Sequence, residues 1–194
     1  MMIGLTYDLR SWYLGRGYTM DETAEFDKEE TISSLETVIN SLGYETERVG
    51  NIFELVEKLA AGKRWDLVFN IAEGLYGDGR ESVVPALLDQ YRIPYVFSGP
   101  VIMGISLNKF YARLLIDAAG VPVCPGIMVS APEDIKNAAS LTYPLFAKPV
   151  AEGTGKGITT KSKVSNGKEL EDICLHLLKT YSQPVLVEEY LPGR

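Results

Sequence analysis

The chain has 194 residues, of which 46% are hydrophobic and 23% charged, enough for one large globular domain or two small ones. Its net charge of -7 argues against a broad nucleic-acid surface but allows one nucleotide held by local lysines. Cys124 and Cys174 have no CxxC spacing, so neither a disulfide framework nor a zinc site is expected. The sequence shows no signal peptide and no long apolar run, which predicts a cytoplasmic protein without a membrane partner.

Residues 1–71 alternate between predicted strands and helices. Short apolar or alternating runs indicate strands, and apolar residues at helical spacing indicate the helices between them. The pattern predicts a parallel sheet with helices on both faces. The predicted elements are strands at 1–6, 44–49 and 65–71, and helices at 32–42 and 52–59, the second capped by Asn51.

Residues 7–28 show no clean periodicity and are predicted to form a long loop. Its Gly15-Arg-Gly17 cannot open a GxGxxG motif, because position 20 is Met. Long loops in compact domains are often functional, so a substrate lid is the better hypothesis for this segment.

Polar residues follow the third predicted strand, in Asn70-Ile-Ala-Glu-Gly-Leu-Tyr-Gly-Asp-Gly-Arg-Glu81. Ligands of open α/β sheets bind at the carboxyl ends of the strands, which makes Glu73, Arg80 and Glu81 candidate site residues. A polar surface loop with turn glycines is the alternative.

Beyond this loop we expect a helix at 82–91, a strand at 93–97 and a helix capped by Ser106. Lys109 falls in the first turn of that helix, where a cation is unfavourable unless an anion lies near. The proline-rich segment that follows suggests a domain boundary near residue 122. The last part is predicted to hold a strand at 126–129, a helix begun by Ser130 and Pro132, a helix at 170–178 and a strand at 185–191.

A short apolar run ends at Lys148 and leads into the glycine-rich segment Glu152-Gly-Thr-Gly-Lys-Gly157. Glycines let backbone N–H groups approach a ligand, and N–H groups together with lysine charges suit a polyphosphate. A P-loop is excluded because Val150 stands where its first glycine is required, and the Rossmann fingerprint fails at Ile158. The open alternatives are a nucleotide loop and a glycine-rich hairpin without a ligand.

Several motifs that occur in a fixed order along the chain favour the nucleotide loop over the hairpin without a ligand. They are Asn70-Ile-Ala-Glu-Gly74, Ile93-Pro-Tyr95, Ser98-Gly99, Leu107-Asn-Lys109, Phe146-Ala-Lys-Pro149, the glycine-rich segment, and Val185-Leu-Val-Glu-Glu-Tyr-Leu-Pro-Gly-Arg194. This set resembles the D-alanine–D-alanine ligase group of the ATP-grasp superfamily, from about residue 67 onward. The resemblance implies an α/β fold with an N-terminal parallel-sheet, Rossmann-like pre-ATP-grasp domain at 1–121. A small central α+β subdomain of the ATP-grasp fold would follow at 122–194.

The resemblance also implies a role for each motif residue. Lys109 and Lys148 match the lysines that contact ATP phosphates, and the strand near Glu188 matches the hinge under adenine. Phe146, Val187, Tyr190 and Leu191 would then form the adenine slot. Glu73, Arg80 and Glu81 would lie on the substrate side as the catalytic set. The full cofactor-binding set implied is Lys109, Lys148, Glu152, Gly153, Thr154, Gly155, Gly157, Glu188, Glu189 and Leu191.

The implied activity is an ATP-dependent ligase that activates a carboxylate as an acylphosphate and lets an amine form the amide, in cell-wall biogenesis. The expected partners are ATP and a small amino-acid or dipeptide-type substrate, and a homodimer is allowed. The family's metal-binding acids lie beyond its hinge strand. No metal ligand is therefore expected among these residues, Mg²⁺ is expected only in a full-length parent, and the chain alone is expected to be inactive.

The sequence departs from the family on the substrate side. Residues 6–12 replace the glycine-rich segment that usually follows the first strand, and Ala72-Glu-Gly-Leu-Tyr-Gly-Asp-Gly-Arg-Glu81 replaces a histidine-containing loop. Two alternatives stay open: a non-catalytic nucleotide-binding or regulatory protein, and an ATP-grasp ligase with another amino-acid substrate.

Overall fold

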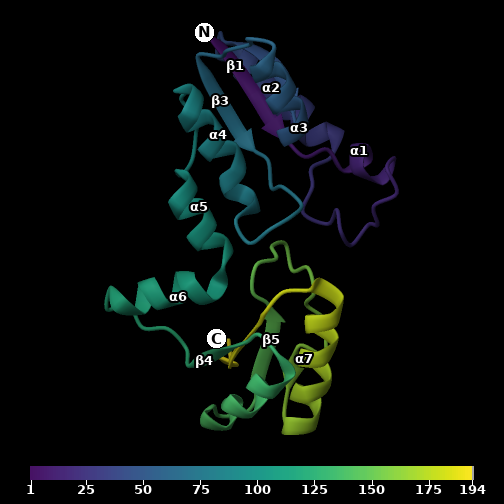
Figure 1. Ribbon diagram of the computed structural model, residues 1–194, viewed down its shortest axis with the longest axis vertical. Coiled ribbons are helices and arrows are strands. Elements are labelled where there is room, and N and C mark those ends of the chain that lie inside the picture. The colour runs from purple at the N-terminus through teal and green to yellow at the C-terminus, as the bar shows by residue number, and fades with distance from the viewer. Residues whose placement is uncertain (194) are drawn as a thin grey trace. The chain divides into compact units, whose positions relative to one another are not determined.

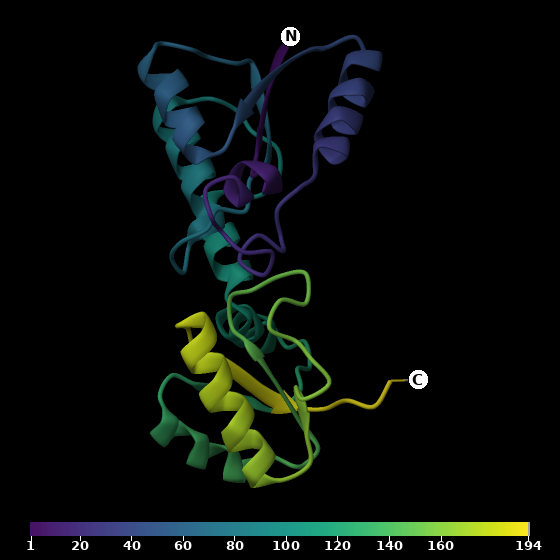
Figure 2. The same ribbon diagram turned by 90° about the vertical axis from the view of Figure 1, so that its right-hand side faces the viewer.

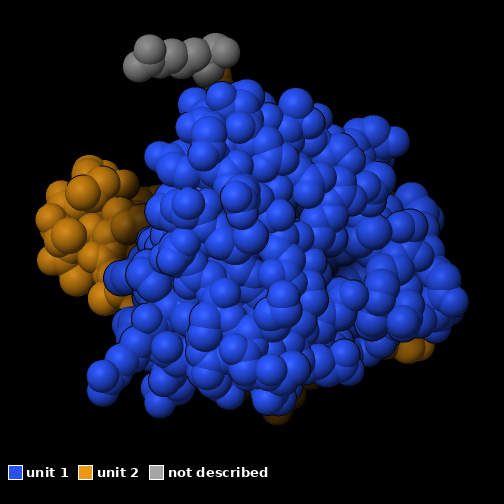
Figure 3. All heavy atoms as spheres, turned by 90° about the horizontal axis from the view of Figure 1, so that it is seen from above, with its two compact units in different colours: residues 1–104 blue, residues 105–194 orange. Residues whose placement is uncertain are grey.

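The computed structural model describes residues 1–193, so Arg194, the last residue of the hinge motif, lies outside the described part (Figure 1). The chain divides into two compact units, residues Met1–Gly104 and Ile105–Arg194, which Figure 3 colours separately. Each unit has its own sheet and its own apolar core. No helix within residues 1–193 is both long enough and apolar enough to cross a bilayer.

Unit 1 is built on the predicted parallel sheet. Strands β1 (Met2–Tyr7), β2 (Glu45–Gly50) and β3 (Leu67–Ile71) pair in parallel in the order β2-β1-β3. Because side chains alternate along a strand, the sheet has two apolar faces. One face packs with α3 (Ile52–Ala60) and α4 (Val83–Tyr91), and the other with α2 (Glu29–Ser41). The expectation of helices on both faces is confirmed.

Local signals place α3 where the sequence predicted it. The side chain of Asn51 accepts hydrogen bonds from the N–H groups of Phe53 and Glu54, and the Glu54 carboxylate accepts from the N–H of Asn51. This capping box satisfies N–H groups that have no partner inside the helix. The expected loop at 7–28 contains one short helix, α1 (Arg10–Leu14).

Two predictions about residues 93–106 are wrong, namely the strand at 93–97 and the helix cap at Ser106. Residues 93–97 form only an isolated bridge between Val68 and Tyr95, because Pro94 has no N–H to continue a ladder. The chain then enters α5 (Pro100–Leu107), a helix that the sequence did not predict. The helix after it, α6 (Lys109–Ala118), is capped by Asn108 rather than Ser106, with the amide oxygen accepting from two N–H groups.

Unit 2 contains an antiparallel sheet in the order β4-β7-β5-β6. Its strands are β4 (Gly126–Val129), β5 (Leu145–Pro149), β6 (Lys163–Val164) and β7 (Val185–Glu189). Helix α7 (Gly167–Tyr181) lies along one face of this sheet (Figure 2). The helix predicted after Ser130 is a 3-10 helix, η2 (Pro132–Ser140), and its Ala138 joins the same core.

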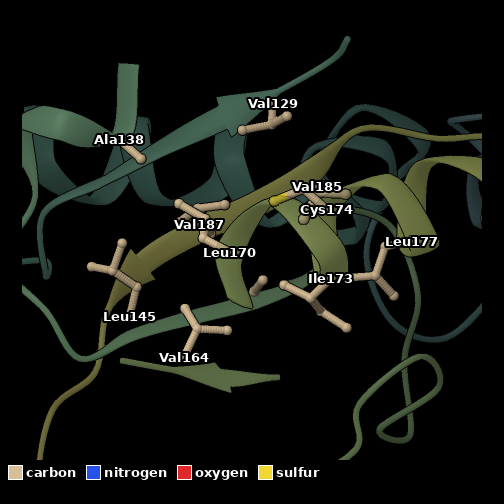
Figure 4. Packing of buried hydrophobic residues seen from close by; sticks show 11 residues of the cluster. Val129, Ala138, Leu145, Val164, Leu170, Ile173, Cys174, Leu177, Val185 and Val187 are labelled. Carbon is tan, nitrogen blue, oxygen red and sulfur yellow. The ribbon is translucent and has the colours of Figure 1, made fainter. Parts of the chain in front are cut away.

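The core of unit 2 lies between the sheet and α7 (Figure 4). Leu170, Ile173, Cys174 and Leu177 of α7 face Val185 and Val187 of β7, among others. Val185 and Val187 of β7 point into this core, so the side chains that alternate with them along the strand point to the other face of the sheet. Cys174 is fully buried, and burial raises the pKa of its thiol to about 12.

The division between units falls earlier in the chain than the boundary expected near residue 122. Helix α6 groups with unit 2 because Leu107 and Phe110 pack against Val150 and Ala151, and the N–H of Lys109 donates to the Val150 carbonyl. The roles assigned to 1–121 and 122–194 stay a prediction.

Candidate functional site

The glycine-rich segment forms a tight loop that leaves the end of β5. Thr154, Gly155 and Gly157 all have positive φ, near +51°, +75° and +76°. At Gly157 a Cβ atom would lie 2.5 Å from Cγ of Pro149, so only glycine fits there. The sequence therefore makes a compact loop that passes close to the strand carrying Lys148.

Lys148 lies on the side of the sheet away from the α7 core and is paired with Glu188. Its ammonium Nζ donates to Oε1 of Glu188, and both side chains are about four-fifths buried, with exposures of 21% and 18%. The second oxygen of Glu188 accepts a hydrogen bond from the thiol of Cys124 at 3.6 Å. Burial and the neighbouring Glu188 carboxylate raise the pKa of that thiol, so it stays protonated.

A second group of contacts centres on Glu152. Its backbone carbonyl accepts from Nζ of Lys109, and its carboxylate pairs with Lys156 at 2.9 Å and with Gln183 at 2.6 Å. Glu152 and Lys156 have side-chain exposures of only 11% each. Glu152 therefore joins α6, the glycine-rich loop and the segment after α7. Two lysines belong to this group, which gives the loop the positive charge that a polyphosphate requires.

The strand expected beneath adenine carries the predicted residues with one correction. Phe146 and Tyr190 have ring centroids 6.2 Å apart, and Lys163 lies 4.1 Å from the centroid of the Tyr190 ring. Val187 cannot line an adenine slot, because the period of two along β7 places its side chain in the apolar core. The N–H of Glu189 donates to the Pro125 carbonyl, and Leu191 lies beyond the last paired residue of β7 and is 67% exposed.

The three predicted substrate-side residues come together in unit 1. The carboxylates of Glu73 and Glu81 lie with that of Glu25 within 4.8 Å of one another. The guanidinium of Arg80 pairs with Glu25 at 2.7 Å and lies 4.0 Å from Glu81. Burial, then the charges of Glu81 and Glu25, raise the pKa of Glu73 to about 8, so Glu73 keeps its proton at neutral pH.

Hydrogen bonds between neighbouring strand ends hold this cluster in place. The side chain of Thr6 donates to Asn70 at 2.8 Å, and Oδ2 of Asp8 accepts from the N–H of Gly74 at 2.8 Å. Gly74 has φ near +69°, and a Cβ there would lie 2.9 Å from the Arg80 carbonyl. Glycine at this position therefore lets the loop fold back onto Arg80.

Sequence reasoning missed Glu25, Gln183 and Asp8. Glu25 lies in the 7–28 loop, where no spacing relates it to Glu73. Gln183 follows α7 and meets Glu152 only through the fold. Asp8 gave a usable signal, since it directly follows a predicted strand at the sheet edge where ligands bind.

Comparisons with known proteins show which proteins this chain is similar to. Residues 115–194 match a family model described as the D-ala D-ala ligase C-terminus. Among curated proteins, the D-alanine–D-alanine ligase of Glaesserella parasuis is 36% identical over 158 residues, covering 80% of this chain and 50% of the relative. That of Cereibacter sphaeroides is 30% identical over 174 residues, covering 88% of this chain and 53% of the relative. The chain thus spans about half the length of these curated relatives.

Solved structures show the same fold. The D-alanine–D-alanine ligase of Bacillus anthracis complexed with ATP superposes with a TM-score of 0.72 at 20% identity, over 100% of this chain and 60% of that one. The VanG D-Ala:D-Ser ligase of Enterococcus faecalis gives a TM-score of 0.72 at 20% identity, over 99% of this chain and 63% of that one. The α/β architecture described above is therefore the fold of the matching part of these solved structures.

Proposed function

Since this chain belongs to the D-alanine–D-alanine ligase family of the ATP-grasp superfamily, we propose that it binds ATP through unit 2 and serves an ATP-dependent carboxylate–amine ligase. The observation that carries the proposal is the arrangement of lysines on and around the glycine-rich loop. Lys109 and Lys156 both contact Glu152, and Lys148 extends from the strand that leads into the loop. Lysines on rigid elements beside glycine backbone suit a triphosphate.

Each lysine donates to a carboxylate or carbonyl oxygen. Such a bond can hold the ammonium group in a position to bind a phosphate oxygen. The Glu188 carboxylate fixes Nζ of Lys148, and the Glu152 carbonyl fixes Nζ of Lys109. An ammonium group has three N–H donors, so the bond from Lys148 to Glu188 leaves donors for a phosphate. Glu152 serves in this proposal as a positioning residue, since its carboxylate binds Lys156 and Gln183.

A site with lysines beside a triphosphate suits the transfer of a phosphoryl group from ATP to a carboxylate. The γ-phosphoryl group of ATP passes to a substrate carboxylate and forms an acylphosphate. An amine then attacks its carbonyl carbon, forms the amide and releases phosphate. Lysine charges aimed at the phosphates stabilise the negative charge that develops during transfer.

The carboxylate cluster of unit 1 does not fit a Mg²⁺ ion. Within residues 1–193 the carboxylates grouped closely enough for a cation are Glu25, Glu73 and Glu81, and these belong to unit 1. There Arg80 already pairs with Glu25, and Glu73 keeps a proton at neutral pH, so the cluster is poor in the free carboxylate oxygens that Mg²⁺ prefers. No step is assigned to a metal here.

The test is calorimetric titration of a non-hydrolysable ATP analogue into wild type, Lys148→Ala and Lys168→Ala. Removing the Lys148 charge should weaken binding by about 1–3 kcal/mol, because a charge-assisted bond to phosphate is lost. Lys168→Ala is the matched control, since Lys168 forms only exposed pairs with Glu171 and Asp172 on α7. Equal affinities for all three proteins would disprove the role of Lys148.

A second measurement separates a ligase from a nucleotide-binding regulator. The protein is incubated with ATP and mixed amino acids, and amide products are sought by mass spectrometry alongside phosphate release. Phosphate release coupled to an amide product supports the ligase. Since this chain alone is expected to be inactive, tight ATP binding with no product fits a partial ligase as well as a regulatory protein, whereas an amide product would exclude the regulatory protein.

A further inference from the structure

A cavity of about 620 Å³ opens in unit 1, where β1 and β3 end, and none of the nucleotide-site residues of unit 2 line it. Its volume falls in the range of small-molecule pockets. The wall is predominantly aromatic and apolar; six of its residues are Trp12, Tyr13, Tyr18, Phe53, Leu75 and Tyr76. The 7–28 loop supplies much of this wall.

The loop that forms the wall is held by its own contacts. The guanidinium of Arg10 donates to the backbone carbonyls of Thr23, Ala24 and Phe26. The ring of Tyr13 is buried and lies 4.5 Å, centroid to centroid, from that of Phe26. The cavity is therefore formed before a ligand arrives, which reduces the entropy lost on binding.

Two tyrosines close the wall between distant parts of the sequence. The hydroxyl groups of Tyr18, from the first loop, and Tyr76, from the loop after β3, lie 2.9 Å apart. Both loops leave the carboxyl ends of parallel strands, which is the edge of an α/β sheet where ligands bind.

Two acids, Asp8 and Glu22, and two arginines, Arg16 and Arg80, line the cavity, and this balance of charge suits a zwitterion. Asp8 is almost fully buried; its carboxylate accepts one bond from the Tyr13 hydroxyl and one from the Gly74 N–H. Because Asp8 is 1% exposed, its negative charge favours a ligand ammonium on that side of the cavity rather than offering open acceptor positions. Arg80 lines the cavity, and Arg16 stacks on the ring of Trp12 with 3.4 Å to its centroid.

We propose that this cavity binds an amino-acid substrate with an aromatic or similarly large apolar side chain, with its ammonium group toward Asp8. The inference rests on the proposed function and names the substrate class of its amino-acid site. Flat rings gain from edge and face contacts with Trp12, Tyr18 and Tyr76. The methyl group of alanine would reach few of these rings and leave most of the cavity to water.

The test is saturation-transfer difference NMR with phenylalanine and alanine, each in both enantiomers, in the absence of nucleotide. One enantiomer of phenylalanine should bind saturably, and alanine at least about tenfold more weakly. Alanine binding as well as phenylalanine, or no binding of phenylalanine to the folded protein, would overturn the proposal.

Variants locate the binding. Tyr76→Ala removes a wall residue whose side chain is 70% exposed, and Val83→Trp fills the cavity from its rim, where Val83 is 46% exposed. The first should weaken phenylalanine binding at least about threefold and the second should abolish it. Tyr44→Ala, at an exposed tyrosine outside the cavity, is the control and should bind as wild type does. Unchanged affinity in both cavity variants would disprove this location.

Calorimetry with the ATP analogue, run on the same samples, distinguishes this inference from the function on which it rests. ATP binding without phenylalanine binding removes the amino-acid class and leaves the nucleotide site standing. Phenylalanine binding without ATP binding keeps the cavity assignment and removes the ligase proposal.

Discussion

The protonation of Glu73 determines the charge of the acidic cluster in unit 1. In the folded protein the pKa of this carboxyl is raised to about 8 by burial and by Glu81 and Glu25, from an ordinary value of 4.5. Between these two values the unfolded chain ionises Glu73 while the folded chain keeps the proton. Folding is therefore opposed increasingly as the pH rises from about 4.5 to about 8, and the opposing effect is complete above that range.

Glu73→Gln should relieve this effect and stabilise the protein at neutral pH. The amide keeps a donor for Glu81 without an ionisable proton, so we expect a gain of about 1–3 kcal/mol at pH 7 that disappears near pH 4. Chemical denaturation of both proteins between pH 4 and 8 measures the difference. Glu57→Gln, on the exposed side of α3, serves as the control. A gain that does not change with pH would contradict the explanation.

At the scale of one element, the glycine-rich loop depends on residues with positive φ. Gly155 and Gly157 have nearly the same φ, but a Cβ at Gly155 would meet no atom within 4 Å, whereas at Gly157 it would meet Pro149 and Tyr181. The two positions therefore separate backbone strain from steric overlap.

Gly155→Ala should destabilise unit 2 by about 1–2 kcal/mol, the strain of a left-handed alanine. Gly157→Ala should lose more, at least about 3 kcal/mol, because Pro149 in β5 and Tyr181 at the end of α7 must also move. Denaturant titration of both variants measures the difference, and calorimetry with the ATP analogue shows whether the loop still binds. Equal losses of stability would mean that the contact with Pro149 does not constrain the loop.

The elements that the sequence predicted best are those with local signals. Asn51 and Glu54 identify the start of α3, and short apolar runs identify β1, β3 and β7. Helix α5 was missed because it is apolar without a polar face, and Val101 and Ile102 on it are exposed. The strand predicted at 93–97 failed at Pro94, whose missing N–H is a local signal that the apolar run outweighed.

The residues of the candidate site also divide into those that the local sequence predicts and those that it does not. Lys148 and the glycine-rich loop could be predicted because they are contiguous in sequence, and Glu73, Arg80 and Glu81 because they follow one strand. Glu25 and Gln183 could not, since their partners lie far away in the chain and only the fold brings them together. Val187 was assigned to the adenine slot although the alternation along β7, readable from the sequence, places it in the core.

At the scale of the whole molecule, two apolar cores support two sites. The core of unit 1 lies against a parallel sheet whose strand ends carry the acidic cluster and the aromatic cavity. The core of unit 2 packs α7 against one face of the sheet, and Lys148 and Glu188 lie on the opposite face. Because the two cores share no residue, the stability of each site should follow its own core.

This expectation can be tested with one leucine from each core. Leu88 in unit 1 and Leu177 in unit 2 are both fully buried, with exposures of 0% and 1%. Truncating either to alanine leaves a cavity and should lower the free energy of unfolding of its own unit by about 2–5 kcal/mol. Amide hydrogen exchange followed by mass spectrometry reports the two units separately.

Leu88→Ala should speed exchange in residues 1–104 and weaken phenylalanine binding, with ATP affinity unchanged. Leu177→Ala should speed exchange in residues 105–193 and weaken ATP binding. Each variant is the matched control for the other, because both remove the same side chain from an equally buried position. Faster exchange throughout the chain in both variants would show that the units unfold as one cooperative body, and the two sites would then depend on a common stability.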